Sequence, residues 1–149
     1  MAPGSGSIRH GEGGKGIGSR WYPKTICKRI AAIGEVKDRI TFVHGDGLAV
    51  LREYTDNPGA VFFIDPPYTA STKRAGRRLY TYNEIDHALL FELAGKLVGD
   101  FLMTYDNCPE ICHMAMQHGF DIEPVAMKST HHATMTELLV AKDLSWLRS

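Results

Sequence analysis

The chain has 149 residues, of which 44% are hydrophobic and 23% are charged, close to the average of globular domains. That length suits one domain with a hydrophobic core, and the composition excludes a wholly disordered chain, a collagen-like chain and a multi-span membrane protein. The 17 basic residues balance the 17 acidic residues, so the net charge indicates no polyanionic partner. Since the sequence has neither an apolar run of about 18 residues nor a signal peptide, we expect a cytoplasmic protein without a membrane partner.

The cysteines give no sign of a covalent or metal-bound framework. Three of them, Cys27, Cys108 and Cys112, are too few for such a framework and include no Cys-x-x-Cys pair. His113 is close to two of them, but no complementary ligand pair with zinc-site spacing occurs elsewhere. We therefore expect reduced thiols and no bound metal.

The N-terminal segment differs in composition from the rest. Residues 1–20 contain seven glycines, but no strand precedes them, so they do not indicate a phosphate-binding glycine loop. Residues 1–40 contain eight Lys and Arg against three acidic residues, so the neutral total hides a basic first quarter. We expect residues 1–20 to form a flexible, glycine-rich basic arm.

The first half of the folded chain predicts helices and strands in alternation. Pro23 and isoleucines at helical spacing indicate a helix over 23–34. Residues 39–44 are β-branched and aromatic and predict a strand, and 48–54 predict a short helix. The continuous apolar run 60–64 is typical of a strand that is buried on both faces of a parallel sheet.

The second half continues the alternation. We expect a helix over 84–97, a strand over 100–105, a helix over 109–118, and strands over 120–127 and 136–141. Strands that alternate with helices indicate an α/β domain with a mainly parallel sheet. The last two strands are joined by a loop too short for a crossover helix, so they are expected to form an antiparallel hairpin on the sheet edge.

The strongest chemical signal is the sequence Phe-Phe-Ile-Asp-Pro-Pro-Tyr. The apolar strand ends at Asp65, and Pro66, Pro67 and Tyr68 follow it. Ligands of parallel sheets bind beyond the carboxyl ends of the strands, so Asp65 is expected to face a ligand. The prolines fix a rigid turn whose carbonyls point outward, and the tyrosine ring offers a flat surface. Two acceptors and a ring in fixed relation suit a planar amine.

This arrangement predicts methylation of the exocyclic amine of a nucleobase. The lone pair of an adenine amino nitrogen is delocalised into the ring, which makes the nitrogen a poor nucleophile. Acceptors from Asp65 and from the Pro66 carbonyl would draw its hydrogens out of plane and localise the lone pair for attack on a methyl sulfonium. The base would first flip out of the duplex and stack on Tyr68.

The Asp-Pro-Pro-Tyr sequence after an apolar strand resembles motif IV of the S-adenosylmethionine-dependent amino-methyltransferases. The order of the surrounding segments resembles the Dam-type class of adenine-N6 DNA methyltransferases. Those segments are 20–23, Gly45-Asp46, Tyr105-Asp106-Asn107 and 135–140. The resemblance implies S-adenosyl-L-methionine as cofactor and double-stranded DNA as partner. It also implies that Asp65 touches the methionyl amine of the cofactor.

The resemblance covers about residues 20–142 and leaves part of the family pattern out. The family begins with a strand followed by a Phe-x-Gly-x-Gly turn, and an acidic residue at the end of the next strand binds the cofactor ribose. Neither feature occurs in this sequence. Residues 21–149 therefore resemble the C-terminal part of a catalytic domain, with a partial Rossmann-like fold whose first strands are missing. A separate chain could supply that cofactor-binding half.

Further candidate residues lie around the motif. The basic residues of the loop that follows it are Lys73, Arg74, Arg77 and Arg78. They suit either phosphate contacts or a solvated loop surface. Tyr80 suits either packing or a wedge beside the flipped base. Asp46 suits either a helix N-cap or a contact to the cofactor.

The sequence thus predicts a site-specific DNA adenine-N6 methyltransferase, present as a truncated or split catalytic domain. Two alternatives stay open. One is an RNA guanine-N2 methyltransferase, which can share the Asp-Pro-Pro-Tyr sequence. The other is an inactive remnant, or one half of a split enzyme, that acts only by binding DNA or a partner chain.

Overall fold

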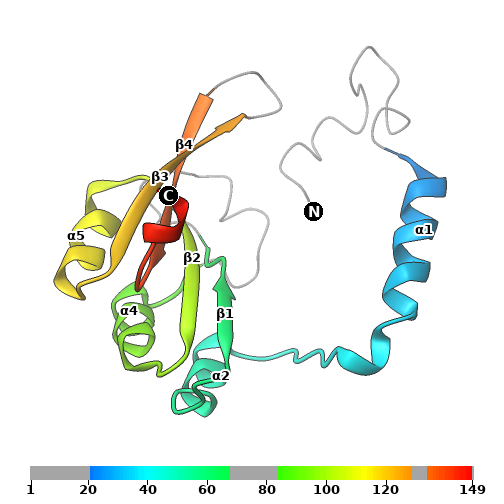
Figure 1. Cartoon of the computed structure of the whole chain (residues 1–149), viewed down its shortest axis with the longest axis horizontal. Helices are drawn as coiled ribbons and strands as arrows, with labels where there is room; N and C mark the ends of the chain where they lie inside the picture. Colours follow the sequence, from blue (N-terminus) through cyan, green and yellow to red (C-terminus); the bar gives the residue numbers. More distant parts are fainter. Residues whose placement is uncertain (1–20, 68–83, 129–133, 149) are drawn as a thin grey trace. The chain divides into compact units, whose positions relative to one another are not determined.

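The computed structural model describes residues 21–67, 84–128 and 134–148 (Figure 1). They belong to two units that divide between His44 and Gly45. The first unit contains helix α1 (Pro23–Gly34) and a 3-10 turn, η4 (Lys37–Arg39). The predicted helix over 23–34 is confirmed. It begins at a proline, whose fixed φ suits the first turn and whose missing N–H is no loss there.

The predicted strand over 39–44 is wrong. Residues 40–44 have no regular structure, and the large side chains among them are exposed, with Phe42 at 85% and Val43 at 62%. A β-branched sequence becomes a strand only where a neighbouring strand and a packing face receive it. No strand within the described ranges pairs with these residues.

The second unit contains an α/β arrangement. Its elements are α2 (Gly47–Glu53), β1 (Val61–Ile64), α4 (His87–Lys96), β2 (Asp100–Asp106), α5 (Pro109–Gln117), β3 (Asp121–Lys128), β4 (Thr134–Ala141) and the 3-10 turn η5 (Ser145–Leu147). The α4 helix begins three residues later than the sequence predicts, because the Asp86 carboxylate accepts a hydrogen bond from Leu89 N at 2.9 Å and caps its first turn.

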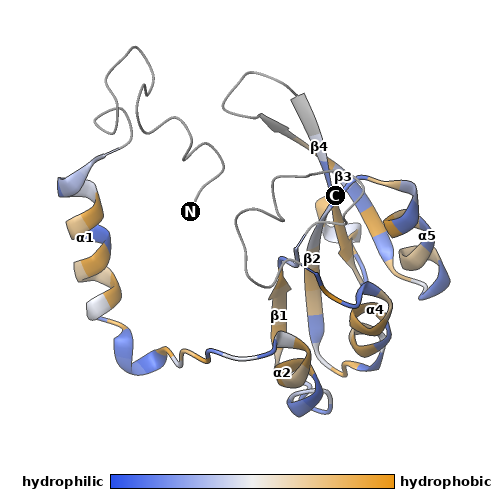
Figure 2. Ribbon diagram, turned by 180° about the vertical axis from the view of Figure 1, so that it is seen from behind, coloured by the Kyte–Doolittle hydropathy of each residue, from blue (hydrophilic) through white to orange (hydrophobic). Residues whose placement is uncertain are grey.

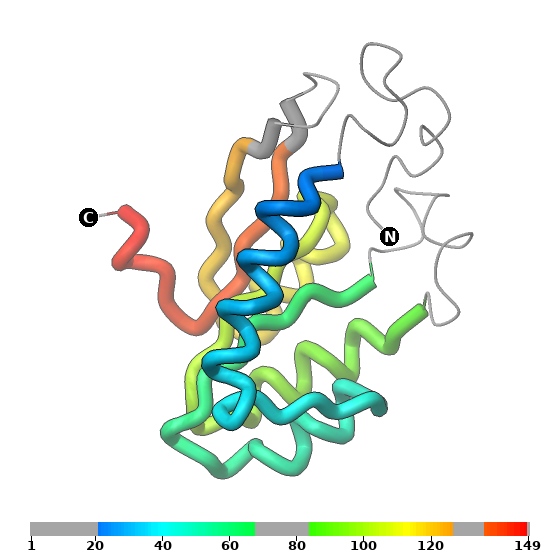
Figure 3. The backbone as a smooth tube through the Cα atoms, turned by 90° about the vertical axis from the view of Figure 1, so that its right-hand side faces the viewer, coloured from blue at the N-terminus to red at the C-terminus, as the bar shows by residue number. Residues whose placement is uncertain are grey.

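The four strands form one mixed sheet in the order β1-β2-β4-β3. β1 and β2 are parallel, whereas β4 runs antiparallel to both β2 and β3. The prediction of a mainly parallel sheet holds in part: only one of the three described pairings is parallel, but β1, β2 and β3 run in the same direction because both β2 and β3 are antiparallel to β4. The predicted hairpin is confirmed, and its two strands run side by side in Figure 3, but β4 is the inner strand and β3 forms the edge.

One face of the sheet carries the hydrophobic core. Alternate β2 residues, Phe101, Met103 and Tyr105, are buried on this face, and the ring of Phe91 in α4 lies 5.7 Å from that of Tyr105. The core also includes α2 and α5, and the hydrophobic colour follows β1 and β2 in Figure 2. On the other face Val61 and Phe63 of β1 are 77% and 70% exposed, so the expected strand over 60–64 forms but is not buried on both faces.

Candidate functional site

The carboxyl ends of β1 and β2 lie at the same edge of the sheet. Ile64 at the end of β1 is paired with Met103 of β2, which places Asp65 beside Thr104. β4 runs the opposite way and pairs Glu137 with Asp106 at the end of β2. Four polar residues from three neighbouring strands therefore lie at the same end of the sheet, which we call the strand-end edge (Asp65, Thr104, Asp106 and Glu137).

Asp65 is exposed and its carboxylate is held from the neighbouring strand. Thr104 Oγ1 donates a hydrogen bond of 2.9 Å to Asp65 Oδ1. Pro66 is buried and Pro67 is half-buried, so the chain is anchored directly after the carboxylate. The two prolines restrict the backbone, and the hydrogen bond restricts the side chain. The arrangement presents a carboxylate to solvent at the end of a strand whose Phe62 and Ile64 side chains pack against the core.

Sequence reasoning did not select Thr104. The sequence offered one sign of a special position: Thr104 is a polar residue inside the segment Phe101-Leu102-Met103-Thr104-Tyr105. A position beside Asp65 follows only from the parallel register of β1 and β2, which the sequence does not reveal.

Tyr105 and His87 form a buried polar contact on the core face. The Tyr105 hydroxyl lies 3.0 Å from His87 Nδ1, and the two ring centroids are 5.6 Å apart. Burial raises the pKa of Tyr105, and the nearby Asp106 charge adds to that effect. Burial lowers the pKa of His87, against the opposing charges of Asp106 and Asp86. This contact gives the buried Tyr105 hydroxyl a hydrogen-bond partner, and alternation along β2 places Thr104 on the opposite face.

Asp46 has a structural role in the second unit. Its carboxylate accepts a hydrogen bond of 3.0 Å from Leu48 N and caps α2. The N-cap alternative from the sequence is therefore confirmed, and the contact to the cofactor stays a prediction.

Several predicted site residues lie outside the described part of the chain. They are Tyr68, Lys73, Arg74, Arg77, Arg78 and Tyr80. The geometry of the candidate site is consequently that of Asp65, Pro66 and Pro67 with the strand-end edge, and the stacking ring and basic loop remain predictions.

Of the groups of S-adenosyl-L-methionine, the resemblance links only the methionyl amine to a described residue, Asp65. The Asp65 carboxylate suits the ammonium group of the methionyl portion. No glycine turn that would suit the adenosine portion follows β1 or β2, since Asp65-Pro66-Pro67 follows β1 and Asn107-Cys108-Pro109 follows β2. Those ranges also hold no cluster of three or more side chains of the types that ligate metals.

Comparison of the chain with protein-family models and with curated protein sequences gave no match. Function is therefore inferred from the residues themselves. Within the described residues, no helix has both the length and the apolar character that crossing a bilayer requires.

Proposed function

We propose that this chain carries the methyl-transfer centre of an S-adenosylmethionine-dependent DNA methyltransferase that acts on the N6 amine of adenine. The observation that carries the proposal is the exposed Asp65 carboxylate, which follows β1 directly, is bonded to Thr104 at 2.9 Å and is followed by the buried Pro66. The α/β folds bind their ligands at the carboxyl ends of parallel strands, and Asp65 is a fixed hydrogen-bond acceptor at such a position.

The sheet supports a partial Rossmann-like fold. β1 and β2 are parallel and α4 lies between them in the chain, which makes a strand–helix–strand unit. β1 is the last strand on its side of the described sheet, and its outward residues Val61 and Phe63 are exposed. An outermost strand of the described sheet that has exposed apolar side chains suits a sheet to which further strands and covering elements are added from elsewhere.

In the proposed reaction Asp65 and the Pro66 carbonyl bind the two hydrogens of the adenine amine. The bonds localise the nitrogen lone pair and orient it, and the carboxylate stabilises the positive charge that develops on the nitrogen during transfer. S-adenosyl-L-methionine, when bound, would supply the electrophilic methyl group: the N–C bond forms as the C–S bond breaks, S-adenosylhomocysteine leaves with the electron pair, and the surplus proton of the methylated amine passes to solvent. Tyr68 stacks on the flipped base, while Lys73, Arg74, Arg77 and Arg78 hold phosphates and Tyr80 fills the gap in the duplex.

The cofactor-binding half is proposed to come from a separate chain. The decisive experiment expresses this chain in cells without N6-methyladenine, alone and together with the N-terminal half of a Dam-type enzyme. Mass spectrometry of the DNA is expected to detect N6-methyladenine in the paired expression, and Asp65→Ala is expected to abolish it. Absence of N6-methyladenine in both expressions would contradict the proposal.

The same cells distinguish the alternative functions. Methylated guanine in ribosomal RNA, with unmodified DNA, would favour an RNA guanine-N2 methyltransferase. Retention of DNA or of the partner half by the purified chain, without any methyl transfer, would favour a binding role. Calorimetric titration of the isolated chain with S-adenosyl-L-methionine is expected to give no heat, because the adenosine pocket belongs to the other half.

A further inference from the structure

Thr104 is placed to control the direction of the Asp65 carboxylate. It lies in β2, while Asp65 follows β1, so the 2.9 Å hydrogen bond joins two strands that are fixed by their own parallel pairing. The β-branched threonine side chain has few rotamers in a strand, so its hydroxyl is offered to Asp65 from a defined position. The donor is thus better fixed than the exposed side chain that accepts from it.

The hydrogen bond to Asp65 also decides whether the Thr104 hydroxyl can donate or accept further hydrogen bonds. A threonine hydroxyl has one hydrogen and two lone pairs. Thr104 gives its hydrogen to Asp65 Oδ1, so it can only accept hydrogen bonds from any further group. An ionised carboxylate likewise only accepts. Both side chains consequently favour a ligand group that carries hydrogens, such as an amine, over a carbonyl.

We propose that Thr104 is a positioning residue that orients the Asp65 carboxylate and makes this part of the strand-end edge accept hydrogen bonds only. This inference rests on the proposed function. In that reaction Thr104 would help the site to prefer a base with an amino group, such as adenine, over one with a carbonyl at the same ring position, such as hypoxanthine. A hydrogen bond between the exposed Asp65 and the half-buried Thr104 adds little to stability, so its loss changes the orientation of Asp65 far more than the fold.

The test compares Thr104→Val, which keeps the shape without the hydroxyl, with Thr104→Ser, which keeps the hydroxyl. NMR scalar couplings between Hα and the two Hβ atoms of Asp65 report its χ1 rotamer in the full chain. One dominant rotamer is expected for the wild type and for Thr104→Ser, and averaged couplings are expected for Thr104→Val. The same couplings in all three proteins would overturn the proposal.

A second measurement separates this inference from the proposed function. In the paired expression, Thr104→Val is expected to lower adenine methylation about tenfold, with recovery in Thr104→Ser. Full methylation in Thr104→Val would overturn the positioning role while leaving the methyltransferase proposal intact. Altered Asp65 couplings without methylation in any variant would support the positioning role and contradict the proposed reaction. Thermal unfolding of Thr104→Val checks that the fold is kept.

Discussion

His87 Nδ1 and the Tyr105 hydroxyl lie 3.0 Å apart where α4 packs on β2. Neutral imidazole can accept a hydrogen bond at one ring nitrogen, whereas the imidazolium ion only donates. Burial lowers the pKa of His87 from its ordinary 6.5, although Asp106 and Asp86 oppose the change. Folding therefore favours the neutral ring.

This contact predicts a pH dependence of stability. Because the pKa of His87 is lower in the folded state than its ordinary 6.5, the neutral ring contributes to folding stability. That contribution is complete above pH 6.5 and is lost as the pH falls below this value. We expect the wild-type melting temperature to fall more between about pH 7 and about pH 5 than that of His87→Gln, whose side chain does not titrate there. The exposed His113→Gln is the control and should keep the wild-type profile. Parallel profiles for wild type and His87→Gln would contradict the expectation.

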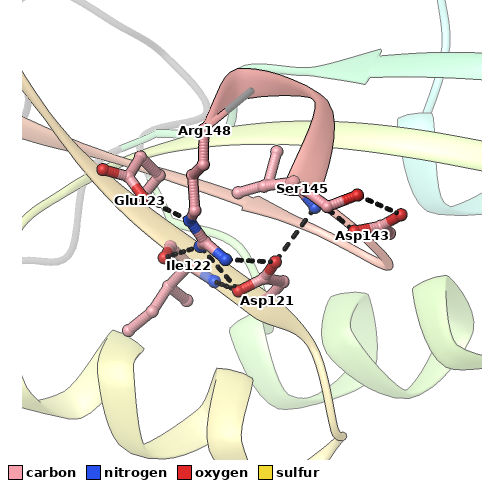
Figure 4. Close-up of polar contacts among 7 residues, drawn as sticks. Asp121, Ile122, Glu123, Asp143, Ser145 and Arg148 are labelled. Carbon is pink, nitrogen blue, oxygen red and sulfur yellow. Dashed lines mark hydrogen bonds and ion pairs between the residues drawn. The ribbon is translucent and has the colours of Figure 1, made fainter.

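The C-terminal residues are held on β3 by Arg148 (Figure 4). Its guanidinium donates to Asp121 at 2.8 and 3.1 Å, to Glu123 at 2.9 Å and to the Ile122 carbonyl at 3.0 Å. The bonds from Arg148 and from the Leu144 amide lower the pKa of Asp121. The planar guanidinium makes several of these bonds at once, which a lysine ammonium cannot reproduce.

We expect Arg148→Lys and Arg148→Ala to speed amide hydrogen exchange in 144–148 by similar factors, while the global melting temperature changes little because the pairs are exposed. High salt should bring the wild type closer to the variants. Lys96→Ala, which breaks the exposed pair with Glu92, is the matched control and should leave this exchange unchanged. Exchange in Arg148→Lys at the wild-type rate would refute the need for a planar group.

Gly99 lies where the chain enters β2, and its backbone is close to the residues before β1. A Cβ atom at this position would lie 2.1 Å from the Ala60 carbonyl oxygen and 2.9 Å from that of Asn57. Both are backbone atoms that cannot turn away, and Asp100 N donates to the same Ala60 oxygen at 3.2 Å. We expect Gly99→Ala to reduce the free energy of unfolding by about 1–3 kcal/mol or more.

Gly95→Ala is the matched control for that measurement. Gly95 is inside α4, and a Cβ atom there would make only ordinary contacts, the nearest at 3.7 Å from His118 Nδ1. Alanine in a helix interior is favoured over glycine by about 0.5–1 kcal/mol, so this variant should be as stable as the wild type or more so. Urea unfolding of both variants decides the matter, and equal stabilities would contradict the close-approach argument.

The sequence predicted most elements of the second unit because their signals are local. The apolar run before Asp65 and the cap at Asp86 are local features that specify a strand and a helix start. Residues 39–44 have a comparable β-branched pattern and form no strand. Pattern alone does not supply the neighbouring strand that a β-strand needs.

The candidate site was predictable only where its signals are local in sequence. Asp65 follows the last residue of β1, as the sequence predicts. Pro66 and Pro67 have no backbone N–H and cannot continue the strand, so their positions define where the strand ends. Its bond to Thr104 could not be foreseen, because the residues are 39 positions apart and meet only through the register of β1 and β2. The inner place of β4 likewise depends on pairing between strands that are distant in sequence.

Lys142 directly follows β4, and its side chain contacts the backbone just after α4. Its ammonium donates to the carbonyls of Leu97 at 2.6 Å, Val98 at 3.3 Å and Gly99 at 2.7 Å. Leu97 is the C-cap of α4, and Val98 and Gly99 connect it to β2, so these carbonyls lie beyond the hydrogen bonds of the helix. A cation at this end of a helix also interacts favourably with the helix dipole. Lys142 therefore joins the end of α4 to the sheet.

We expect Lys142→Met, which keeps the length but removes the charge and the donors, to reduce the free energy of unfolding by about 1 kcal/mol. The exposed Lys96→Met is the control, since its ion pair with Glu92 is on the helix surface and should contribute less than about 0.5 kcal/mol. Lys142→Arg should recover part of the loss, because a guanidinium also donates to carbonyls but has a different shape. If Lys142→Met unfolds at the wild-type urea concentration, water satisfies these carbonyls as well as the lysine does, and the ammonium adds nothing to the fold.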